Sequence, residues 1–259
     1  MPEQHNVPAL AGATEVAPLD NPVIISDLHL TMKKPATIMA FMKFLKDVAA
    51  RHSELVILGD FFDFWLGDDA MRDAEAVIAQ LKLYTSYGHR LLIMPGNRDV
   101  MIGADFAKAC GGELLAPQIK VNIRGRDFLL SHGDEWCLLD KPYQQFRAMV
   151  RNPEWQAAML AKPVAERLQI ALQAREQSEY DKSEKSAAVM DVVETAVAED
   201  AAKFGVDCVI HGHTHKPGAH LTGLIERWVI PDWDLDTPGV HRAGCITFLA
   251  DGRPQFQNF

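Results

Sequence analysis

The sequence predicts an α/β fold built on a parallel sheet, and three observations support that prediction. Short apolar runs of the kind that form buried strands occur at 23–26, 55–58 and 90–94. Apolar residues at helical spacing fill the segments between them, at 35–51 and 70–87. Polar motifs rich in aspartate and histidine follow the strands directly. This alternation is typical of parallel sheets, whose functional residues gather at the carboxyl ends of the strands.

The elements of the first half follow from local composition. Residues 1–21 are rich in Pro and Ala and lack the basic start and apolar core of a signal peptide, so we expect a flexible extension there. The helix at 35–51 carries its apolar face through Ile38, Phe41 and Leu45. The second and third strands stop where glycine or proline interrupts the apolar run.

The second half of the chain changes rhythm. Apolar runs at 119–123 and 128–131, on either side of Gly125, predict a hairpin. Residues 141–203 contain no strand pattern and resemble helices interrupted by two prolines. Strands return in three further segments, 208–210, 227–230 and 245–249. We therefore expect three parts: the extension (1–21), a core (22–136 and 204–259) and an inserted helical cap (137–203).

Charge and composition exclude several classes of function. The net charge of −9 argues against a nucleic-acid-binding protein, which needs basic residues to neutralise phosphates. No segment approaches the roughly 18 apolar residues that cross a bilayer, so we expect a cytoplasmic protein. The four cysteines are scattered without a CxxC pair, which favours reduced thiols in the core.

The expected cap differs in charge from the rest of the chain. Residues 141–175 contain six basic and two acidic side chains, a local balance of +4. The same segment has apolar residues at helical spacing. It therefore fits either amphipathic helices packed on the core or a surface attracted to an anionic membrane or lipid.

Five short motifs carry the candidate chemistry. They are D-x-H (Asp27, His29), GD (Gly59, Asp60), GNRD (Gly96–Asp99), HGD (His132–Asp134) and HGHTH (His211–His215). Imidazole nitrogens and carboxylate oxygens at the ends of neighbouring strands are typical of a site that holds cations. Asp27 and His29 share one face of an extended segment because they are two residues apart. Asp60 can bridge two ions, which would together activate a water and clamp a phosphoryl group.

The order of these motifs resembles the calcineurin-like metallophosphoesterase superfamily over residues 23–216. The resemblance implies a β-sandwich core flanked by helices, with two metal ions. One ion would be held by Asp27, His29, Asp60 and His215. The other would be held by Asp60, Asn97, His132 and His213, with Asp60 as the bridge.

Further motifs resemble a narrower family, the UDP-2,3-diacylglucosamine diphosphatases of lipid A synthesis. They are SDLHL (26–30), LGDFFDFWLGDD (58–69), GNRD (96–99), HGDEWC (132–137), YQQFR (143–147) and KSAAVMDV (185–192). The resemblance implies an enzyme with two Mn²⁺ ions per chain, in which water attacks the α-phosphorus of the UDP-linked lipid. The products would be UMP and 2,3-diacylglucosamine 1-phosphate (lipid X). It also implies that the cap covers the acyl chains. From the basic amphipathic segment of the cap we expect peripheral attachment to the cytoplasmic face of the inner membrane, and we expect a monomer.

The same resemblance assigns residues to catalysis and to substrate binding. Catalysis would involve Asp60, Asn97, Arg98 and His132. The substrate would contact Asn97, Arg98, Asp140, Ser178, Lys182, Lys185 and His213. Arg98 stands where most superfamily members have histidine, and a guanidinium supplies a permanent, bidentate charge to phosphate oxygens.

Several alternatives remain open at this point. Arg98 could instead be an ion-pair partner of Asp99, which is also a plausible partner of His132, and Ser178 and Lys182 could be solvated surface residues. We expect Asp63, Asp68 and Asp69 to orient loops or cap the helix that follows them, and Tyr143 to serve packing. We expect His211 either to support the site or to contact the substrate. The fold could also serve another phosphodiesterase, or a scaffold that has lost its metals.

Overall fold

The computed structural model describes residues 12–184 and 189–258. Its strands are β1 (Ala13–Glu15), β2 (Pro22–Ile25), β3 (Glu54–Leu58), β4 (Arg90–Met94), β5 (Glu113–Ile123), β6 (Arg126–Ser131), β7 (Cys208–His211), β8 (Gly218–Thr222), β9 (Ile225–Val229), β10 (Gly244–Phe248) and β11 (Pro254–Asn258). Its helices are α1 (Pro35–Asp47), α2 (Glu75–Ser86), α3 (Ala104–Cys110), α4 (Lys141–Val150), α5 (Pro153–Leu160), α6 (Val164–Glu184) and α7 (Glu194–Phe204). Short 3₁₀ turns lie at Ala49–Arg51, Asp68–Ala74 and Asp134–Trp136.

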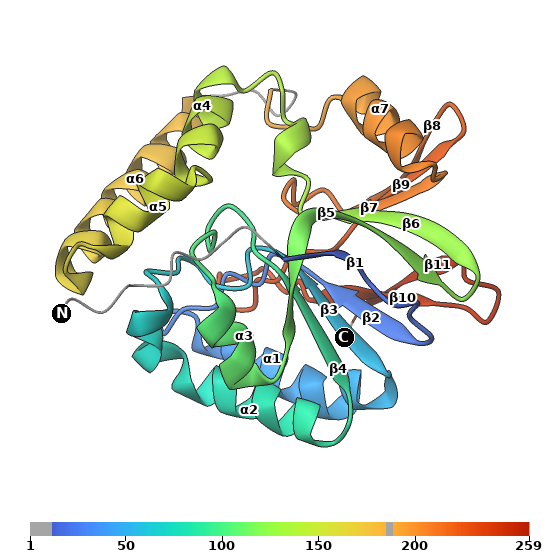
Figure 1. Cartoon of the computed structure of the whole chain (residues 1–259), viewed down its shortest axis with the longest axis horizontal. Helices are drawn as coiled ribbons and strands as arrows, with labels where there is room; N and C mark the ends of the chain where they lie inside the picture. The colour runs from blue at the N-terminus through green and yellow to red at the C-terminus, as the bar shows by residue number, and fades with distance from the viewer. Residues whose placement is uncertain (1–11, 185–188, 259) are drawn as a thin grey trace.

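The strands form one curled sheet (Figure 1). Its order is β11-β10-β2-β3-β4-β5-β6-β7-β9-β8, with β1 beside β5. Strands β2, β3 and β4 are parallel, as the alternation of strand and helix predicts. The long strand β5 pairs with β4 at its start and with β6 over its later part. Strand β5 therefore belongs both to the half of the sheet that contains β2, β3 and β4 and to the half that contains β6, β7 and β9. The sheet closes over an apolar interior shared by the two halves, and the expected β-sandwich core is confirmed.

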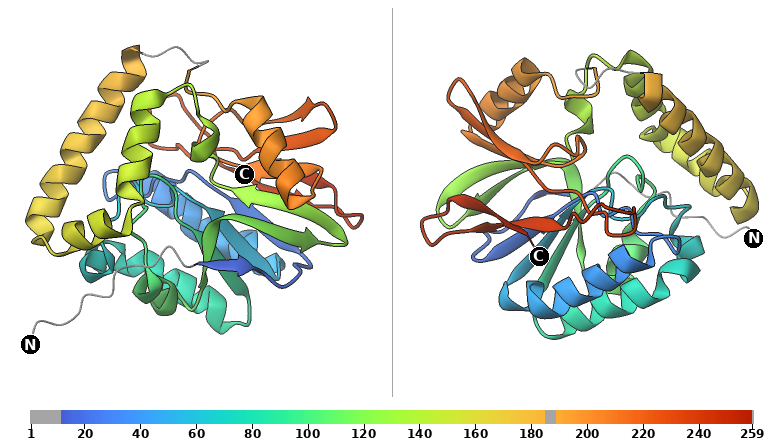
Figure 2. Two further views of the ribbon diagram at one scale, coloured as in Figure 1. Left: turned by 45° about the horizontal axis from the view of Figure 1, so that its top comes forward. Right: turned by 180° about the vertical axis from the view of Figure 1, so that it is seen from behind.

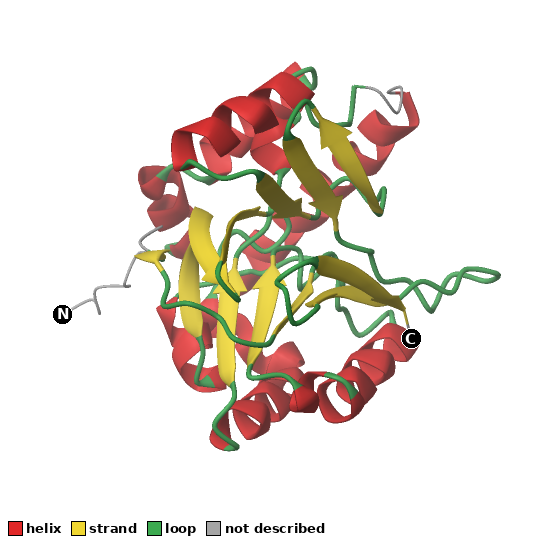
Figure 3. Cartoon of the chain, turned by 90° about the vertical axis from the view of Figure 1, so that its right-hand side faces the viewer, coloured by secondary structure: helices red, strands yellow, loops and turns green. Residues whose placement is uncertain are grey.

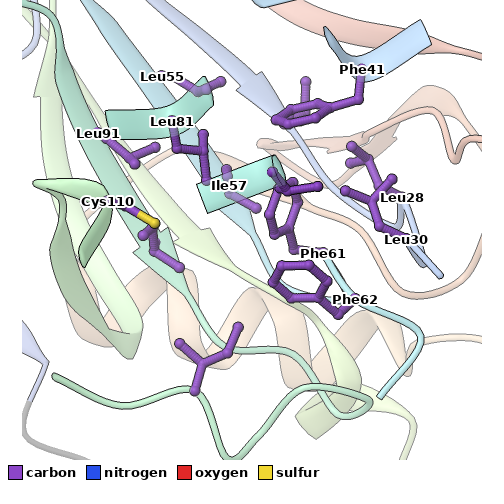
Figure 4. Packing of buried hydrophobic residues seen from close by; sticks show 14 of the residues in the cluster. Leu28, Leu30, Phe41, Leu55, Ile57, Phe61, Phe62, Leu81, Leu91 and Cys110 are labelled. Atoms are coloured by element: carbon purple, nitrogen blue, oxygen red, sulfur yellow. The ribbon is translucent and has the colours of Figure 1, made fainter. Parts of the chain in front are cut away.

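Side chains alternate across the strands and divide the core into layers. In β3, Leu55 and Ile57 pack towards α1, α2 and α3, in the layer that Figure 4 shows from close by. Val56 and Leu58 point the opposite way, into the interior between the two halves of the sheet. Every residue of β3 is buried, as expected of a strand whose sheet is covered on both faces.

Helix α7 covers the outer face of the other half of the sheet. Its residues Val197 and Ala201 pack with Leu129 of β6 and Val209 of β7. Helix α7 lies within the segment expected to form the cap, yet its apolar face at i, i+4 spacing is buried on the core. The helices that stand apart from the sheet are α4, α5 and α6, as Figures 1 and 2 show.

An ion-pair cluster joins α4 to the core. The carboxylate of Asp134, which follows β6, is buried. Its oxygens lie 2.8 Å from Nε of Arg147 and 3.3 Å from a terminal nitrogen of Arg151. Both arginines are on or directly after α4, so ion pairs hold the first helix of the cap against the core.

A second group of carboxylates holds α6. Arg167 pairs with Asp69, and Arg175 pairs with Asp63. Asp68, which lies between these two aspartates in the sequence, accepts the amides of residues 103 and 106 at the start of α3, and not those of the helix that follows Asp68. Four of the six basic residues of the cap segment therefore pair with core carboxylates. This arrangement favours packing on the core as the reason for the local positive charge.

Several elements differ from the sequence expectations. The expected helix at 35–51 is α-helical only to Asp47, and the one at 70–87 begins as a 3₁₀ turn. Residues 12–21, expected in a flexible extension, contain β1 and the buried Leu19, because β5 offers backbone partners along this edge. Helix α3 and strands β8 and β11 were not expected, since they are short or largely exposed and lack clear periodicity. None of the helices in the described residues is long and apolar enough to cross a membrane.

Candidate metal centre

Each predicted metal ligand follows the carboxyl end of a strand, and the curled sheet brings these ends together. The assignments are Asp27 and His29 after β2, Asp60 after β3, Asn97 after β4, His132 after β6, and His213 and His215 after β7. These strands lie in the middle of the sheet, which Figure 3 shows between its helical layers. The site thus draws on both halves of the sandwich.

A first group of donors consists of Asp27, His29 and His215. Nε2 of His215 lies 3.2 Å from Nε2 of His29 and 3.4 Å from Oδ1 of Asp27. One ligand atom from each of the three residues lies within 4.8 Å of the others. Two imidazoles and a carboxylate converging at this spacing form a suitable pocket for a divalent cation.

A second group lies beside the first. Nε2 of His132 is 3.4 Å from Oδ1 of Asp60 and 3.0 Å from Oδ1 of Asn97. The same Asn97 oxygen is 2.9 Å from Nδ1 of His213. Asp27, Asp60 and His132 meet the spacing of a metal site, so Asp27 takes part in both three-residue groups.

Asp60 lies between the two groups of donors. Its Oδ1 faces His132, and its Oδ2 lies 3.9 Å from Nδ1 of His29. The geometry therefore supports Asp60 as a candidate bridge and adds Asp27 as a second carboxylate near both positions.

The backbone at the ligands is strained. Among the described residues, six that are not glycine have a positive φ, and five of them are Asp27, His29, Asp60, His213 and His215. A residue with a Cβ rarely adopts this conformation, which costs on the order of 1–3 kcal/mol. Strain concentrated at five candidate ligands indicates that the loops are shaped for a function.

The glycines of the motifs leave room for the ligands. A Cβ on Gly96 would lie 2.2 Å from Oδ1 of Asp60, and one on Gly59 would lie 2.5 Å from Nδ1 of His132. A Cβ on Gly212 would lie 2.3 Å from Oδ2 of Asp27. The glycines of these three motifs are therefore required, because a side chain at any of them would clash with a candidate ligand.

The residues also fit a cation in their electrostatics. Oδ1 of Asp27 and Nδ1 of His29 are buried and have no hydrogen-bond partner among the described residues. Burial, with the positive charge of Arg98 among the smaller causes, lowers the pKa of His29 well below its usual value, so this imidazole is neutral. Burial opposes the charged form of His132, yet Asp60 and Asp27 raise its pKa to about 9. Buried carboxylates that attract a proton to this extent favour any cation placed among them.

Asp99 fixes the two loops that carry Asp60 and Asn97. Its oxygens accept the amides of residue 96 at 2.7 Å, residue 61 at 2.8 Å, and residues 62 and 60 at 3.2 and 3.3 Å. Burial raises the pKa of Asp99 to about 7. The sequence suggested His132 or Arg98 as its partner, whereas these hydrogen bonds are to the backbone. His132 is instead oriented by the carbonyl of Leu58, 2.8 Å from its Nδ1.

The structure describes some of the residues predicted to bind the substrate. The backbone amide of Arg98 donates to Oδ1 of Asp60 at 2.8 Å, so the backbone of this arginine lies beside the candidate ligands. Asp140 caps α4 by accepting the amide of Tyr143 at 3.2 Å. Ser178 is half-buried on α6. Lys182 also lies on α6, but its side chain is outside the described residues, as is the whole of Lys185.

Some residues at the site were not predicted to have their observed roles. Asp134 was recognised only as part of HGD, yet it binds α4. Tyr143, expected to serve packing, donates its hydroxyl to Asp134, and its ring lies 5.5 Å from that of His213. His211 is buried behind the ligands, with Nε2 3.2 Å from Arg227, which agrees with a supporting role. The sequence places Asp134 and His211 within ligand motifs, but it carries no signal for these contacts.

Comparison with known proteins shows what this chain is similar to. Residues 22–217 match the family model of the calcineurin-like phosphoesterases. A UDP-2,3-diacylglucosamine hydrolase of Bordetella pertussis is 42% identical over 236 residues, covering 88% of this chain and 92% of that protein. One of Chromobacterium violaceum is 46% identical over 212 residues, covering 81% and 89%. The structure of an archaeal phosphodiesterase aligns with a TM-score of 0.47 at 14% identity, covering 92% of this chain and 99% of that one.

Proposed function

This chain belongs to the calcineurin-like phosphoesterases and, among them, to the family of UDP-2,3-diacylglucosamine hydrolases, and from that membership we propose that it hydrolyses UDP-2,3-diacylglucosamine. The pyrophosphate bond is cleaved, and the products are UMP and 2,3-diacylglucosamine 1-phosphate. The observation that carries the proposal is the pair of adjacent donor groups centred on Asp27 and Asp60. Such an arrangement suits the in-line displacement of a phosphoryl group.

We assign two Mn²⁺ ions to each chain, which when bound supply an activated water and a clamp on the attacked phosphoryl group. One set of ligands is Asp27, His29, Asp60 and His215; the other is Asp60, Asn97, His132 and His213. The short distances within each group, the buried atoms without hydrogen-bond partners and the steric role of the glycines support this assignment. Neutral His29 offers a lone pair without first losing a proton.

Arg98 has a separate role in the proposed reaction. Its guanidinium stays protonated at neutral pH, so it stabilises charge on the phosphate oxygens and donates no proton to the leaving group. The hydrogen bond from its backbone amide to Asp60 supports this role, because it holds residue 98 beside a proposed metal ligand. Attack on the α-phosphorus releases a phosphate leaving group, for which proton transfer from a histidine is not essential.

We place the lipid part of the substrate against the cap. Asp140 at the start of α4 and Ser178 on α6, together with Lys182, Lys185 and His213, are the proposed contacts. Support comes from the position of α4, where Tyr143 packs beside the candidate ligand His213. The cap is thus joined to the metal centre by direct contact.

The direct test is hydrolysis of UDP-2,3-diacylglucosamine by the purified protein with Mn²⁺, measured as release of UMP. We expect rapid release that EDTA abolishes and Mn²⁺ restores. Turnover of bis(p-nitrophenyl) phosphate without UMP release would instead indicate another phosphodiesterase on this fold. No bound divalent ion and no turnover of either compound would indicate a scaffold without metals.

We further propose that the chain works as a monomer at the cytoplasmic face of the inner membrane, where its lipid substrate resides. Support comes from exposed apolar side chains near the start of the cap: Leu138, Leu139, Phe146 and Met149. Since most basic cap residues pair with core carboxylates, apolar contact contributes more to this attachment than positive charge does.

Sedimentation with phospholipid vesicles tests the attachment. We expect the wild-type protein to pellet with vesicles and Leu139→Glu to pellet less. Leu224→Glu is the matched control, because Leu224 is also exposed but lies in the loop between β8 and β9. Equal amounts of protein pelleted with and without vesicles would contradict the membrane proposal and leave the hydrolase proposal untouched.

A further inference from the structure

Asp232 lies in the loop after β9 and is buried against a candidate metal ligand. Its carboxylate oxygen Oδ2 lies 3.5 Å from Nδ1 of His215. The other ring nitrogen of His215, Nε2, faces Asp27 and His29. The imidazole therefore has one nitrogen towards the cation site and the other towards a carboxylate that is 2% exposed.

We propose that Asp232 is a positioning residue that sets the tautomer and ring orientation of His215. A proton on Nδ1 of His215 faces the carboxylate, which leaves the lone pair of Nε2 directed at the metal. A carboxylate behind a ligating histidine also makes the imidazole a stronger ligand. This inference rests on the proposed metal centre and extends it to the loop between β9 and β10.

Arg242 holds Asp232 in place from the other side. Its Nε lies 3.1 Å from both carboxylate oxygens, and its Nη2 lies 2.8 Å from Oδ2. Such a two-pronged contact fixes the plane of the carboxylate. Arg242, Asp232 and His215 form a continuous chain from the surface to the metal centre.

Backbone hydrogen bonds join this loop to the segment after β2 and to the end of β7. The amide of Trp233 donates to the carbonyl of Asp27 at 3.1 Å, and the amide of Ile230 donates to the carbonyl of His211 at 2.8 Å. The indole of Trp233 is buried and donates to the carbonyl of Gly244 at 3.0 Å. These bonds place Asp232 beside His215 independently of any substrate.

An alternative role for Asp232 is to stabilise its own loop through Arg242. The two roles predict different results, because a loop role changes the melting temperature of the metal-free protein and a positioning role changes metal affinity. Asp207 provides a matched control. It pairs with Arg126 at 3.0 Å just before β7, away from the ligands that follow this strand.

The test measures Mn²⁺ binding to metal-free wild-type protein, Asp232→Asn and Asp207→Asn, by titration with detection of free Mn²⁺. We expect Asp232→Asn to weaken one of the two Mn²⁺ sites by about 10–100-fold, with Asp207→Asn like wild type. Equal affinities at both sites of Asp232→Asn and wild type, within a factor of about two, would overturn the inference. Wild-type protein that binds no Mn²⁺ would overturn the metal centre itself, which is a distinguishable result.

A second measurement needs no folded Asp232 variant. Wild-type protein with ¹⁵N-labelled histidine, loaded with diamagnetic Zn²⁺, reports by NMR which ring nitrogen of His215 carries the proton, with His215→Gln used to assign the signals. A proton on Nδ1 supports the inference. A proton on Nε2, or metal bound to Nδ1, overturns it.

Discussion

The hydroxyl of Tyr143 donates a 2.9 Å hydrogen bond to the carboxylate of Asp134. Asp134 follows the candidate ligand His132 by two residues, whereas Tyr143 belongs to the cap helix α4. The Tyr143 ring also packs beside His213. The cap therefore contacts the metal centre through a buried acid and a ligand, so a change in the position of α4 reaches both.

Replacing Asp134 with Asn should destabilise the protein strongly. The carboxylate is buried between Arg147 and Arg151, and their positive charges outweigh its burial and hold its pKa well below the usual range. Removing one partner of a buried ion pair costs about 3–5 kcal/mol. We expect the metal-free protein to melt at least roughly 6 °C lower than wild type, measured by calorimetry.

The control for this variant is Asp127→Asn. Asp127 pairs with Lys120 at 2.9 Å, but both side chains are about 40% exposed. Surface pairs of this kind contribute about 0–1 kcal/mol. Similar melting temperatures for the two variants would mean that Asp134 does not stabilise the junction between cap and core.

Replacing Arg98 with Ala should lower kcat/KM without loss of metal. The hydrogen bond that joins residue 98 to Asp60 is made by the backbone amide, so the variant retains it. Loss of a charge that stabilises the transition state costs about a hundredfold or more in rate. The measurements are UMP release and metal content by mass spectrometry.

Arg98→Lys separates charge from geometry in the same position. Lysine keeps the positive charge but cannot make a bidentate contact, so we expect a kcat/KM between those of Arg98→Ala and wild type. Loss of bound metal in Arg98→Ala would place Arg98 in the support of the ligands, which contradicts a role confined to the substrate.

Much of the fold and most candidate ligands could be predicted because their signals are local. Asp60 and His132 each lie within two residues of the end of a buried apolar strand, and parallel strands bring such positions together. The length of β5 could not be predicted, since Pro117 and exposed polar residues interrupt its apolar pattern. The hairpin with β6 is local, but the start of β5 depends on pairing with β4, which ends 19 residues earlier in the sequence.

The roles of the acidic residues that support the site could not be predicted from local sequence for a similar reason. Asp232 lies 17 residues from His215 in the sequence, and a buried aspartate has the same letter as an exposed one. Asp134 was within a recognised motif, but its partners lie on a helix that the sequence places only as part of a cap. Long-range contacts assign these roles, and one sequence does not contain them.

Replacing Gly96 with Ala should disrupt the metal centre by sterics alone. The new Cβ would lie 2.2 Å from Oδ1 of Asp60 and 2.3 Å from its amide nitrogen. Gly96 does not have the positive φ that would add backbone strain. Overpacking costs about 1–3 kcal/mol, here at the candidate bridge, so we expect weaker Mn²⁺ binding and loss of most turnover.

Gly218→Ala is the matched control for Gly96→Ala. Gly218 also lacks a positive φ, and its new Cβ would meet only the far end of the His220 ring, at 3.2 Å. We expect wild-type metal binding and turnover from this variant. If Gly96→Ala bound Mn²⁺ as well as Gly218→Ala does, the close packing of Asp60 against Gly96 would have no functional importance.

Replacing Asp60 with Ala tests the dinuclear centre most directly. Asp60 is the carboxylate whose two oxygens face His132 and His29, one from each group of donors. Its loss leaves these imidazoles without the charge between them and removes the proposed bridge. We expect UMP release to fall by at least about a thousandfold, equivalent to about 4 kcal/mol of transition-state stabilisation. Metal content should fall below two ions per chain, whereas Asp73→Ala, at an exposed position in the 3₁₀ turn before α2, should behave as wild type. Near-normal turnover by Asp60→Ala would be incompatible with a bridging role for Asp60.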